Sequence, residues 1–292
     1  KVRLLTWIPG RLWSGVNPQL DTLRLGLGER CGRLTHALQG FDHPMAHRQF
    51  EWDIAQALWT KTHLNLFETA EKEILSHFMD AFENNQGSYA KLRKSVVHND
   101  ANDNNIIVTE ELVEPQVRAF IDYGDAIYTQ TINDLAVAIA YAAMHHNDPL
   151  DAALPIVTGY HKSFPLLEEE LEHLYRAIAM RLVVSVTKSA LNKIKEPDNT
   201  YLLVSEKPAW EVLRKWYRVH PDFAHFSFRK ACGFTCHPKE THFELWAREH
   251  TFSLKELFPT VAVNDVHPIN LSVASEWVGH REEFNDLDLL QF

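Results

Sequence analysis

VVHNDANDNNIIV, residues 96–108, decides how this chain folds, and FIDYGDA, residues 120–126, completes it. In each stretch, carboxylates and amides stand directly against a short apolar run. Such runs, rich in β-branched residues in the first stretch, are typical of short strands that end in polar loops. Placing many carboxylates and amides beside a core is costly unless they bind a ligand or each other. The two stretches therefore mark a candidate site between short strands.

The sequence around this site is mainly helical. Apolar residues recur at helical spacing on both sides of it, and short apolar runs occur only near the chain start and around the two polar stretches. We predict strands at 2–8, 95–97, 105–108 and 117–121, and helices at 18–38, 64–82, 134–144, 165–191 and 208–232. The fold class is thus α+β, mainly α-helical, with a small central β-hairpin patch.

Composition excludes several classes of function. Acidic residues (39) exceed basic ones (29), which gives a net charge of −10 and argues against a nucleic-acid partner. No apolar run reaches the roughly 18 residues that a membrane span needs. Three cysteines are too few for a disulfide framework and indicate a reducing compartment. We therefore expect a cytoplasmic protein with neither a membrane nor a nucleic-acid partner.

The residue types of the two stretches fit phosphoryl transfer. That reaction needs a carboxylate that orients the acceptor hydroxyl and takes its proton, and hard oxygen ligands for Mg²⁺. The pattern H-x-D-x-x-x-x-N, followed by a strand that ends in Asp, supplies such a set. Here the pattern consists of His98, Asp100, Asn105 and Asp122. A solvated polar loop is the alternative, which the joint spacing makes the weaker one.

These motifs resemble the aminoglycoside phosphotransferase superfamily. Residues 98–105 look like its catalytic loop and Asp122 like its metal-binding Asp, while Asp125-Ala126 and Asp134-Leu135-Ala136 stand at the family's spacing. The resemblance implies the C-terminal lobe of a protein kinase-like fold. It also implies Mg²⁺-dependent transfer of the γ-phosphoryl group of ATP or GTP to a hydroxyl of a small molecule.

The resemblance also assigns roles. Asp100 would be the catalytic base or hydroxyl-orienting carboxylate, and Asn105 and Asp122 would bind Mg²⁺. His98 and Asp134 would brace the loop. Asp125 would contact the acceptor or brace the site.

Further segments are similar to the hydroxylysine kinase branch of the superfamily. Ala101-Asn102-Asp103 replaces the more usual loop sequence, and Asn99 replaces a common Gly, a change that Asn tolerates because it adopts unusual backbone angles more readily than most residues. Residues 3–10 and 197–206 also look like this branch. The resemblance implies that Leu5, Thr6, Trp7 and Ile8 form a nucleotide-binding hinge. It implies an acceptor such as a hydroxylated amine or hydroxy-amino acid.

Trp52-Asp53 also resembles a pair in that branch. An aromatic ring with a carboxylate can receive a substrate ammonium group. A core Trp beside a surface Asp is the simpler interpretation, and both stay open here.

The resemblance divides the chain into a hinge strand (1–10), a phosphotransferase C-lobe (11–257) and a tail or interdomain linker (258–292). It places the N-lobe before residue 1, so we expect this chain to be inactive by itself. Fusions of this branch with a class III, pyridoxal-phosphate aminotransferase-like module occur in bacteria, and the chain's start and tail would suit a piece of one. Gly26-Leu27-Gly28 is too short for a phosphate loop and predicts close helix packing instead.

Alternative functions remain to be weighed. The chain could be an antibiotic kinase acting on aminoglycosides, or a catalytically inactive pseudokinase that serves as an interaction module. His43 and His47 have the spacing of a metal pair, but Pro44 favours a helix-start turn. Glu168, Glu169 and Glu170 could form an acidic rim for a cationic substrate, although pairing with a helix dipole explains them too.

Overall fold

The computed structural model describes residues 6–196, 206–236 and 245. Residues 1–218 form one compact unit, which contains both polar stretches, and residues 219–292 form a second. The helices of the first unit are α1 (Asp21–Ala37), α2 (Thr69–Asn84), α3 (Gln86–Tyr89), α4 (Ile132–Ala142), α5 (Pro149–Ser163), α6 (Glu168–Lys195) and α7 (Glu206–Tyr217). Its 3₁₀ segments are η1 (Trp13–Gly15), η2 (Pro44–Ala46), η3 (Ile54–Leu66) and η4 (Tyr123–Asp125). The second unit contains α8 (Pro221–Ala231).

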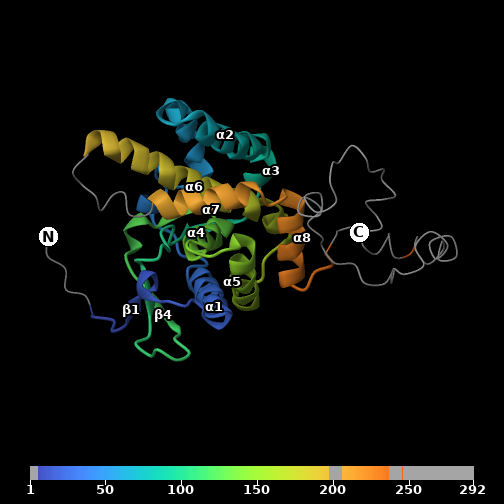
Figure 1. Ribbon diagram of the computed structural model, residues 1–292. Coiled ribbons are helices and arrows are strands. Elements are labelled where there is room, and N and C mark those ends of the chain that lie inside the picture. The colour runs from blue at the N-terminus through green and yellow to red at the C-terminus, as the bar shows by residue number, and fades with distance from the viewer. Residues whose placement is uncertain (1–5, 197–205, 237–244, 246–292) are drawn as a thin grey trace. The chain divides into compact units, whose positions relative to one another are not determined.

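Helix α6 is the centre of the first unit, where it contacts α2, α4, α7 and η3 (Figure 1). Its middle is buried nearly all round, as expected for a helix enclosed by others. Glutamates in the first turn and Lys193 and Lys195 in the last turn match the helix dipole. Glu170, however, is buried and binds Arg93 through two short contacts of 2.7 and 2.8 Å, so it is not part of an acidic rim.

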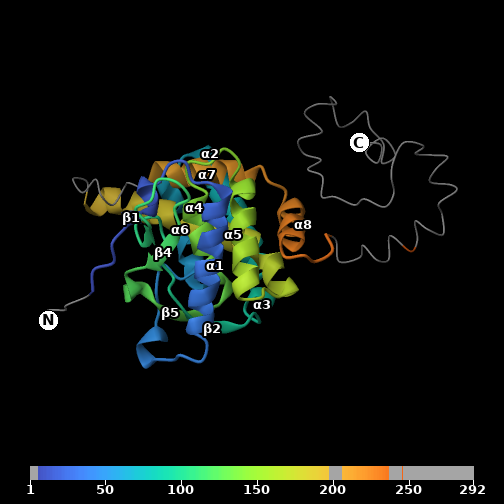
Figure 2. The ribbon, with the colours of Figure 1, turned by 90° about the horizontal axis from the view of Figure 1, so that it is seen from below.

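Helices α1 and α5 lie side by side in both views (Figures 1 and 2) because glycines let their backbones approach. A Cβ atom at Gly28 would overlap the carbonyl oxygen of Ile156 and lie 2.8 Å from the backbone nitrogen of Tyr160. A Cβ atom at Gly159 would overlap the carbonyl oxygen of Leu25. The predicted close packing is therefore confirmed at Gly28. It is wrong at Gly26, where added atoms would meet nothing within 4 Å.

The strands form two small antiparallel sheets rather than one patch. One sheet has the order β1 (Arg11–Leu12), β3 (Ile106–Val108), β4 (Val117–Phe120); the other pairs β2 (Lys94–Val97) with β5 (Ile127–Gln130). The predicted β3–β4 hairpin is confirmed, with Ile106 opposite Phe120 and a register shift between Ile107 and Val108. Strand β5 was not predicted, and it holds β2 beside the hairpin's polar ends rather than within its sheet.

Other predictions need correction. Thr6–Ile8 form no strand, the side chain of Trp7 is 83% exposed, and the first strand begins at Arg11 instead. The helix predicted at 64–82 begins at Thr69, after η3. The helix predicted at 208–232 is divided between α7 and α8, because Pro221 begins a new helix. Helix α5 was not predicted. The predicted tail, 258–292, and the segment 197–205 lie outside the described residues.

Cys31, Cys232 and Cys236 are not joined in disulfide bonds. Within the described ranges, every helix is too short or too polar to traverse a lipid bilayer.

Candidate active site

The loop after β2 is braced by the first turn of α4. The carboxylate of Asp134 is buried and accepts the backbone N–H groups of His98 (3.3 Å) and Asn99 (2.9 Å). Burial raises the pKa of Asp134, and His98 and these two hydrogen bonds oppose that rise. Nδ1 of His98 accepts the N–H of Asp100 (3.2 Å), so its Nε2 donates to the carbonyl of Ile121 at 2.9 Å. His98 and Asp134 thus make the contacts that loop-bracing residues require.

Asn99 occupies the turn of this loop with φ = 65°, a left-handed conformation. The departure from Gly is tolerated because Asn adopts this region more readily than most residues. Its side chain is fully buried, and the amide finds no hydrogen-bond partner in the described part of the chain. Unpaired buried amides are costly, so this position combines backbone strain with an unsatisfied polar group.

Asp100 is held by amides on one oxygen and a guanidinium on the other. Its Oδ2 accepts from Nδ2 of Asn105 (2.7 Å) and Nδ2 of Asn102 (3.0 Å). Its Oδ1 accepts from Arg181 at 2.7 Å. Nδ2 of Asn105 also donates to the backbone carbonyl of Asp100 at 2.9 Å, which turns Oδ1 of Asn105 away from these contacts and leaves it as a ligand atom.

The hairpin brings Asp122 next to this group. The N–H of Ile121 donates to the carbonyl of Asn105 at 3.0 Å, which places the residue after β4 beside the residue before β3. Asp122 has φ = 60°, is exposed, and accepts the N–H of Gly124 at 3.2 Å on one oxygen. Its other oxygen remains for a ligand. Asp122 therefore stands one residue beyond the hydrogen bond between Ile121 and Asn105.

Asp125 follows in η4 and shares this electrostatic environment. Partial burial raises its pKa, and the carboxylates of Asp100 and Asp122 add to that rise. The guanidinium groups of Arg181 and Arg48 oppose it. Arg48 reaches the same corner because it donates to the carbonyl of Gly124 at 3.0 Å.

The donor chemistry fits a magnesium ion. Asn105 and Asp122 offer one amide and one carboxylate oxygen, and Mg²⁺ commonly takes one or two protein ligands and fills its octahedron with phosphate oxygens and water. Across residues 6–196 and 206–236, no group of three His, Cys, Asp or Glu side chains could hold a metal by itself.

Arg181, in the middle of α6, was missed by the sequence analysis. Its side chain is 1% exposed, lies between the rings of Trp52 (4.6 Å) and Tyr141 (5.4 Å), and donates to the carbonyl of Trp52 at 3.2 Å. An arginine among apolar residues of a buried helix was the available signal, because such a cation needs a partner. The partner, Asp100, stands 81 positions earlier in the sequence.

The simpler interpretation of Trp52 and Asp53, a core Trp beside a surface Asp, is wrong in its second half, because Asp53 is buried and Trp52 is only partly so. A face of the Trp52 ring is covered by Arg181. Asp53 is buried and caps η3: it accepts the N–H of Ala55, the hydroxyl of Thr129 (2.8 Å) and the amide of Gln56 (2.9 Å). Its oxygens are therefore engaged by the chain.

The other predicted residues take different positions, or fall outside the described ranges. Thr6, Trp7 and Ile8 precede β1 without regular structure, and Leu5 is not among the described residues. His43 accepts the N–H of Met45 at the start of η2, and His47 pairs with Asp42 at 2.6 Å. The helix-start turn is thus confirmed.

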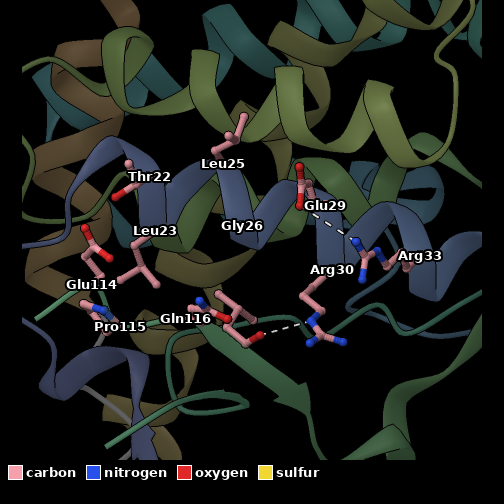
Figure 3. Close-up of a pocket in the computed structure, with 11 residues that line it drawn as sticks. Thr22, Leu23, Leu25, Gly26, Glu29, Arg30, Arg33, Glu114, Pro115 and Gln116 are labelled. Atoms are coloured by element: carbon pink, nitrogen blue, oxygen red, sulfur yellow. Dashed lines mark hydrogen bonds and ion pairs between the residues drawn. The ribbon is translucent and has the colours of Figure 1, made fainter. Parts of the chain in front are cut away.

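A separate cavity of about 480 Å³ lies between α1 and the loop before β4 (Figure 3). None of the predicted site residues lines it. Its charged groups engage the chain itself: Arg30 donates to the carbonyl of Val117 at 3.0 Å, and Glu29 pairs with Lys162 (2.7 Å) and more loosely with Arg33 (4.0 Å). The cavity is therefore distinct from the candidate site.

Comparison with known families agrees with this geometry. Residues 1–173 match the phosphotransferase enzyme family (APH). The chain belongs to this family. The match contains the cluster of Asp100, Asn105 and Asp122 and ends before Arg181.

Curated relatives are hydroxylysine kinases. The chain is 27% identical to hydroxylysine kinase of Mus musculus over 229 residues, which cover 74% of this chain and 60% of the relative. It is 24% identical to the Danio rerio enzyme over 242 residues, or 76% of this chain and 68% of that one. The chain thus spans about 60% of the length of the mouse protein.

Solved structures show the same fold. A microcompartment-associated aminopropanol kinase aligns with a TM-score of 0.52 and 15% identity, covering 73% of this chain and 64% of that one. A choline/ethanolamine kinase family protein of Mesorhizobium loti gives 0.52 and 12%, covering 75% and 69%. The GDP complex of aminoglycoside 2'-phosphotransferase-IIIa gives 0.51 and 10%, covering 72% and 68%. The predicted mainly helical, kinase-like fold is thereby confirmed.

Proposed function

We propose that this chain is the catalytic lobe of a kinase that transfers the γ-phosphoryl group of ATP or GTP to a hydroxyl of a small amine or hydroxy-amino acid. One observation carries the proposal. The amide of Asn105 is hydrogen-bonded to Asp100 at 2.7 Å, and β3 pairs with β4 so that Asp122 lies beside them. In this proposal, the hydroxyl-orienting carboxylate and the two metal ligands that phosphoryl transfer requires would stand at one end of a hairpin.

In this proposal Asp100 acts on the acceptor. Its carboxylate orients the acceptor hydroxyl and takes its proton as the hydroxyl oxygen bonds to the γ-phosphorus. The bond from that phosphorus to the β-bridging oxygen breaks, and a nucleoside diphosphate leaves. Asn105 and Asp122 would hold Mg²⁺, which neutralises charge on the phosphates when it is bound. Asp134 and His98 keep the loop in place.

Two findings support a small amine or hydroxy-amino acid as acceptor. Hydroxylysine kinases are relatives over three quarters of this chain. The site also presents three carboxylates, Asp100, Asp122 and Asp125, which attract a cationic acceptor. Asp125 is our candidate for direct contact with the acceptor. Arg48, which neighbours Asp125, is positively charged and would suit an acceptor that also has a carboxylate.

The test uses the full-length protein that contains this chain, with Mg²⁺ and either ATP or GTP. The acceptors are 5-hydroxylysine, ethanolamine and an aminoglycoside, and mass spectrometry detects the phosphorylated product. Asp100→Asn should reduce the rate by at least about 100-fold, since general-base catalysis contributes about 10²–10⁴. Asn104→Ala is the matched control, because this amide stands in the same loop and bonds only Ser14 and Asp103 among described side chains.

Each outcome assigns a function. Phosphorylated hydroxylysine or ethanolamine supports the proposal and identifies the acceptor, and the preferred nucleotide follows from the same reactions. A product formed from the aminoglycoside alone would establish the antibiotic kinase instead. If no acceptor is phosphorylated and no metal-dependent nucleotide binding is detected, the protein is a pseudokinase or interaction module.

A further inference from the structure

We infer that Arg181 is a positioning residue for the phosphoryl transfer step, and that Trp52 and Asp53 hold it in place. This inference rests on the proposed function of Asp100. It concerns a helix outside the two polar stretches, and it gives the Trp52-Asp53 pair a role other than substrate contact. It rests on four kinds of contact: an ion pair, a backbone hydrogen bond, two aromatic contacts and a helix cap.

The guanidinium joins two acceptors that come from different parts of the chain. One terminal nitrogen donates to Oδ1 of Asp100 at 2.7 Å, and the other donates to the backbone carbonyl of Trp52 at 3.2 Å. Only a planar fork with donors on separate nitrogens can make both bonds while it is stacked on a ring. Lysine has three N–H donors on one nitrogen and lacks the planar fork that stacks on a ring.

The setting fixes the guanidinium plane. Its central carbon lies 4.6 Å from the Trp52 ring centre and 5.4 Å from the Tyr141 ring centre, and the side chain is 1% exposed. Nε has no hydrogen-bond partner among the described residues, so the group is not held by all its donors. The ion pair and the rings must therefore determine its position, and a buried cation of this kind is strongly coupled to its partner.

The loop that presents Trp52 is itself anchored. Asp53 caps η3 through the N–H of Ala55 at 3.0 Å and receives the hydroxyl of Thr129, in β5, at 2.8 Å. A chain of contacts thus runs from β5 through Asp53 and Trp52 to Arg181, and from there to Asp100. Trp52 stands just before η3, and Arg181 stands in α6. Because η3 and α6 are in contact, the elements that present these two residues are packed against each other.

This arrangement has a defined consequence for catalysis. Amides of Asn102 and Asn105 hold Oδ2 of Asp100, and Arg181 sets the direction of Oδ1. Without Arg181 the Asp100 carboxylate can rotate about its Cβ–Cγ bond, because only Oδ2 is still held. The acceptor hydroxyl then loses its alignment with the γ-phosphorus. Misplacement of a reacting group by about 1 Å can cost about 100-fold in rate.

The experiment compares Arg181→Met, Arg181→Lys, Trp52→Phe and Trp52→Ala in the full-length protein. We expect Arg181→Met and Arg181→Lys to lower kcat by about 100-fold, while the KM for nucleotide changes less than about threefold. Trp52→Phe should keep most of the activity because it retains a ring, and Trp52→Ala should lose it. Arg176→Met, on the same helix, is the control and should retain parental kcat.

A second readout does not depend on activity. Arg181→Met and Asp100→Asn are combined in a double-mutant cycle, and unfolding in urea is measured for each variant. Each single variant leaves one charge of the pair buried without its partner, whereas the double variant removes both charges. We therefore expect the unfolding constant of the double variant to be at least about tenfold lower than the value predicted by multiplying the two single effects. If Asp100→Asn is inactive but Arg181→Met keeps parental kcat, or if the cycle shows additivity, the inference is overturned. If Asp100→Asn retains activity, the proposed function fails instead, and the inference about Arg181 fails with it, whatever coupling the cycle shows.

Discussion

Alanine substitutions at Gly26 and Gly28 should have opposite effects on stability. Both glycines belong to α1 and stand two positions apart. At Gly28 a new Cβ would overlap the carbonyl oxygen of Ile156 and lie 2.8 Å from its carbonyl carbon and from the nitrogen of Tyr160. At Gly26 the same atom would meet nothing within 4 Å and would extend into the cavity beside β4.

The change in unfolding free energy of each variant follows from two terms. Replacing a helical Gly by Ala stabilises a helix by about 1 kcal/mol, and this term is common to both variants. Overpacking costs about 1–3 kcal/mol, and the upper value applies at Gly28 because backbone atoms of α5 cannot rotate away as a side chain can. We therefore expect Gly26→Ala to gain up to about 1 kcal/mol and Gly28→Ala to lose about 2 kcal/mol. The difference of about 3 kcal/mol isolates the packing term.

The assay is urea unfolding followed by tryptophan fluorescence and far-UV circular dichroism, with both variants and the parent measured side by side. Gly159→Ala provides a second test from the opposite helix, where the new Cβ would overlap the carbonyl oxygen of Leu25. A difference below about 1 kcal/mol between the Gly26 and Gly28 variants would refute the reasoning, because it would mean that α1 and α5 separate at no cost.

Three further predictions concern buried polar groups. Asn99→Gly should raise the unfolding free energy by about 1 kcal/mol in urea titrations, since it removes a side chain at φ = 65° and an unpaired buried amide; a loss of stability would contradict this account. Burial lowers the pKa of His173 to about 4, so stability should fall by up to about 1.4 kcal/mol per pH unit as pH drops from about 6.5 towards 4. His173→Gln should flatten that slope, and unchanged pH dependence would exclude His173 as its source. Glu170→Gln should cost about 2–3 kcal/mol by calorimetry because it breaks the pair with Arg93, which is partly exposed, whereas exposed Glu168→Gln should change stability by less than about 0.5 kcal/mol; equal effects would refute this.

The proximity of the candidate site residues was predictable because most of them are local in sequence. His98, Asp100 and Asn105 occupy one loop, so their spacing along the chain restricts their separation in space. Asp122 follows a strand whose apolar pattern was clear, and the β3–β4 hairpin brought it into place. Short-range patterns of this kind are those that a sequence states most directly.

Arg181 and strand β5 were not predicted because both depend on contacts with residues far away in the sequence. The partner of Arg181 is 81 residues away, and helix periodicity does not indicate which face of an enclosed helix meets a loop. Strand β5, Ile127–Gln130, is short, and its pairing with β2 decides its conformation. Thr6–Ile8 have an apolar pattern but no neighbouring strand in the described structure, so the local pattern alone was not sufficient.

The β3–β4 hairpin also bears on how the number of residues between Asn105 and Asp122 can vary among related chains. Asn105 and Asp122 stand at one end of the hairpin, joined by the bond between Ile121 and Asn105, while the connecting loop lies at the other end with Leu112 and Val113 exposed. Residues inserted or deleted in that loop change the number of residues between Asn105 and Asp122 without changing their separation in space. The stretches around Asn105 and Asp122 therefore keep a fixed spacing within themselves, while the number of residues between them is free to change. A search for distant relatives should fix the spacing within each stretch and leave the number of residues between them free.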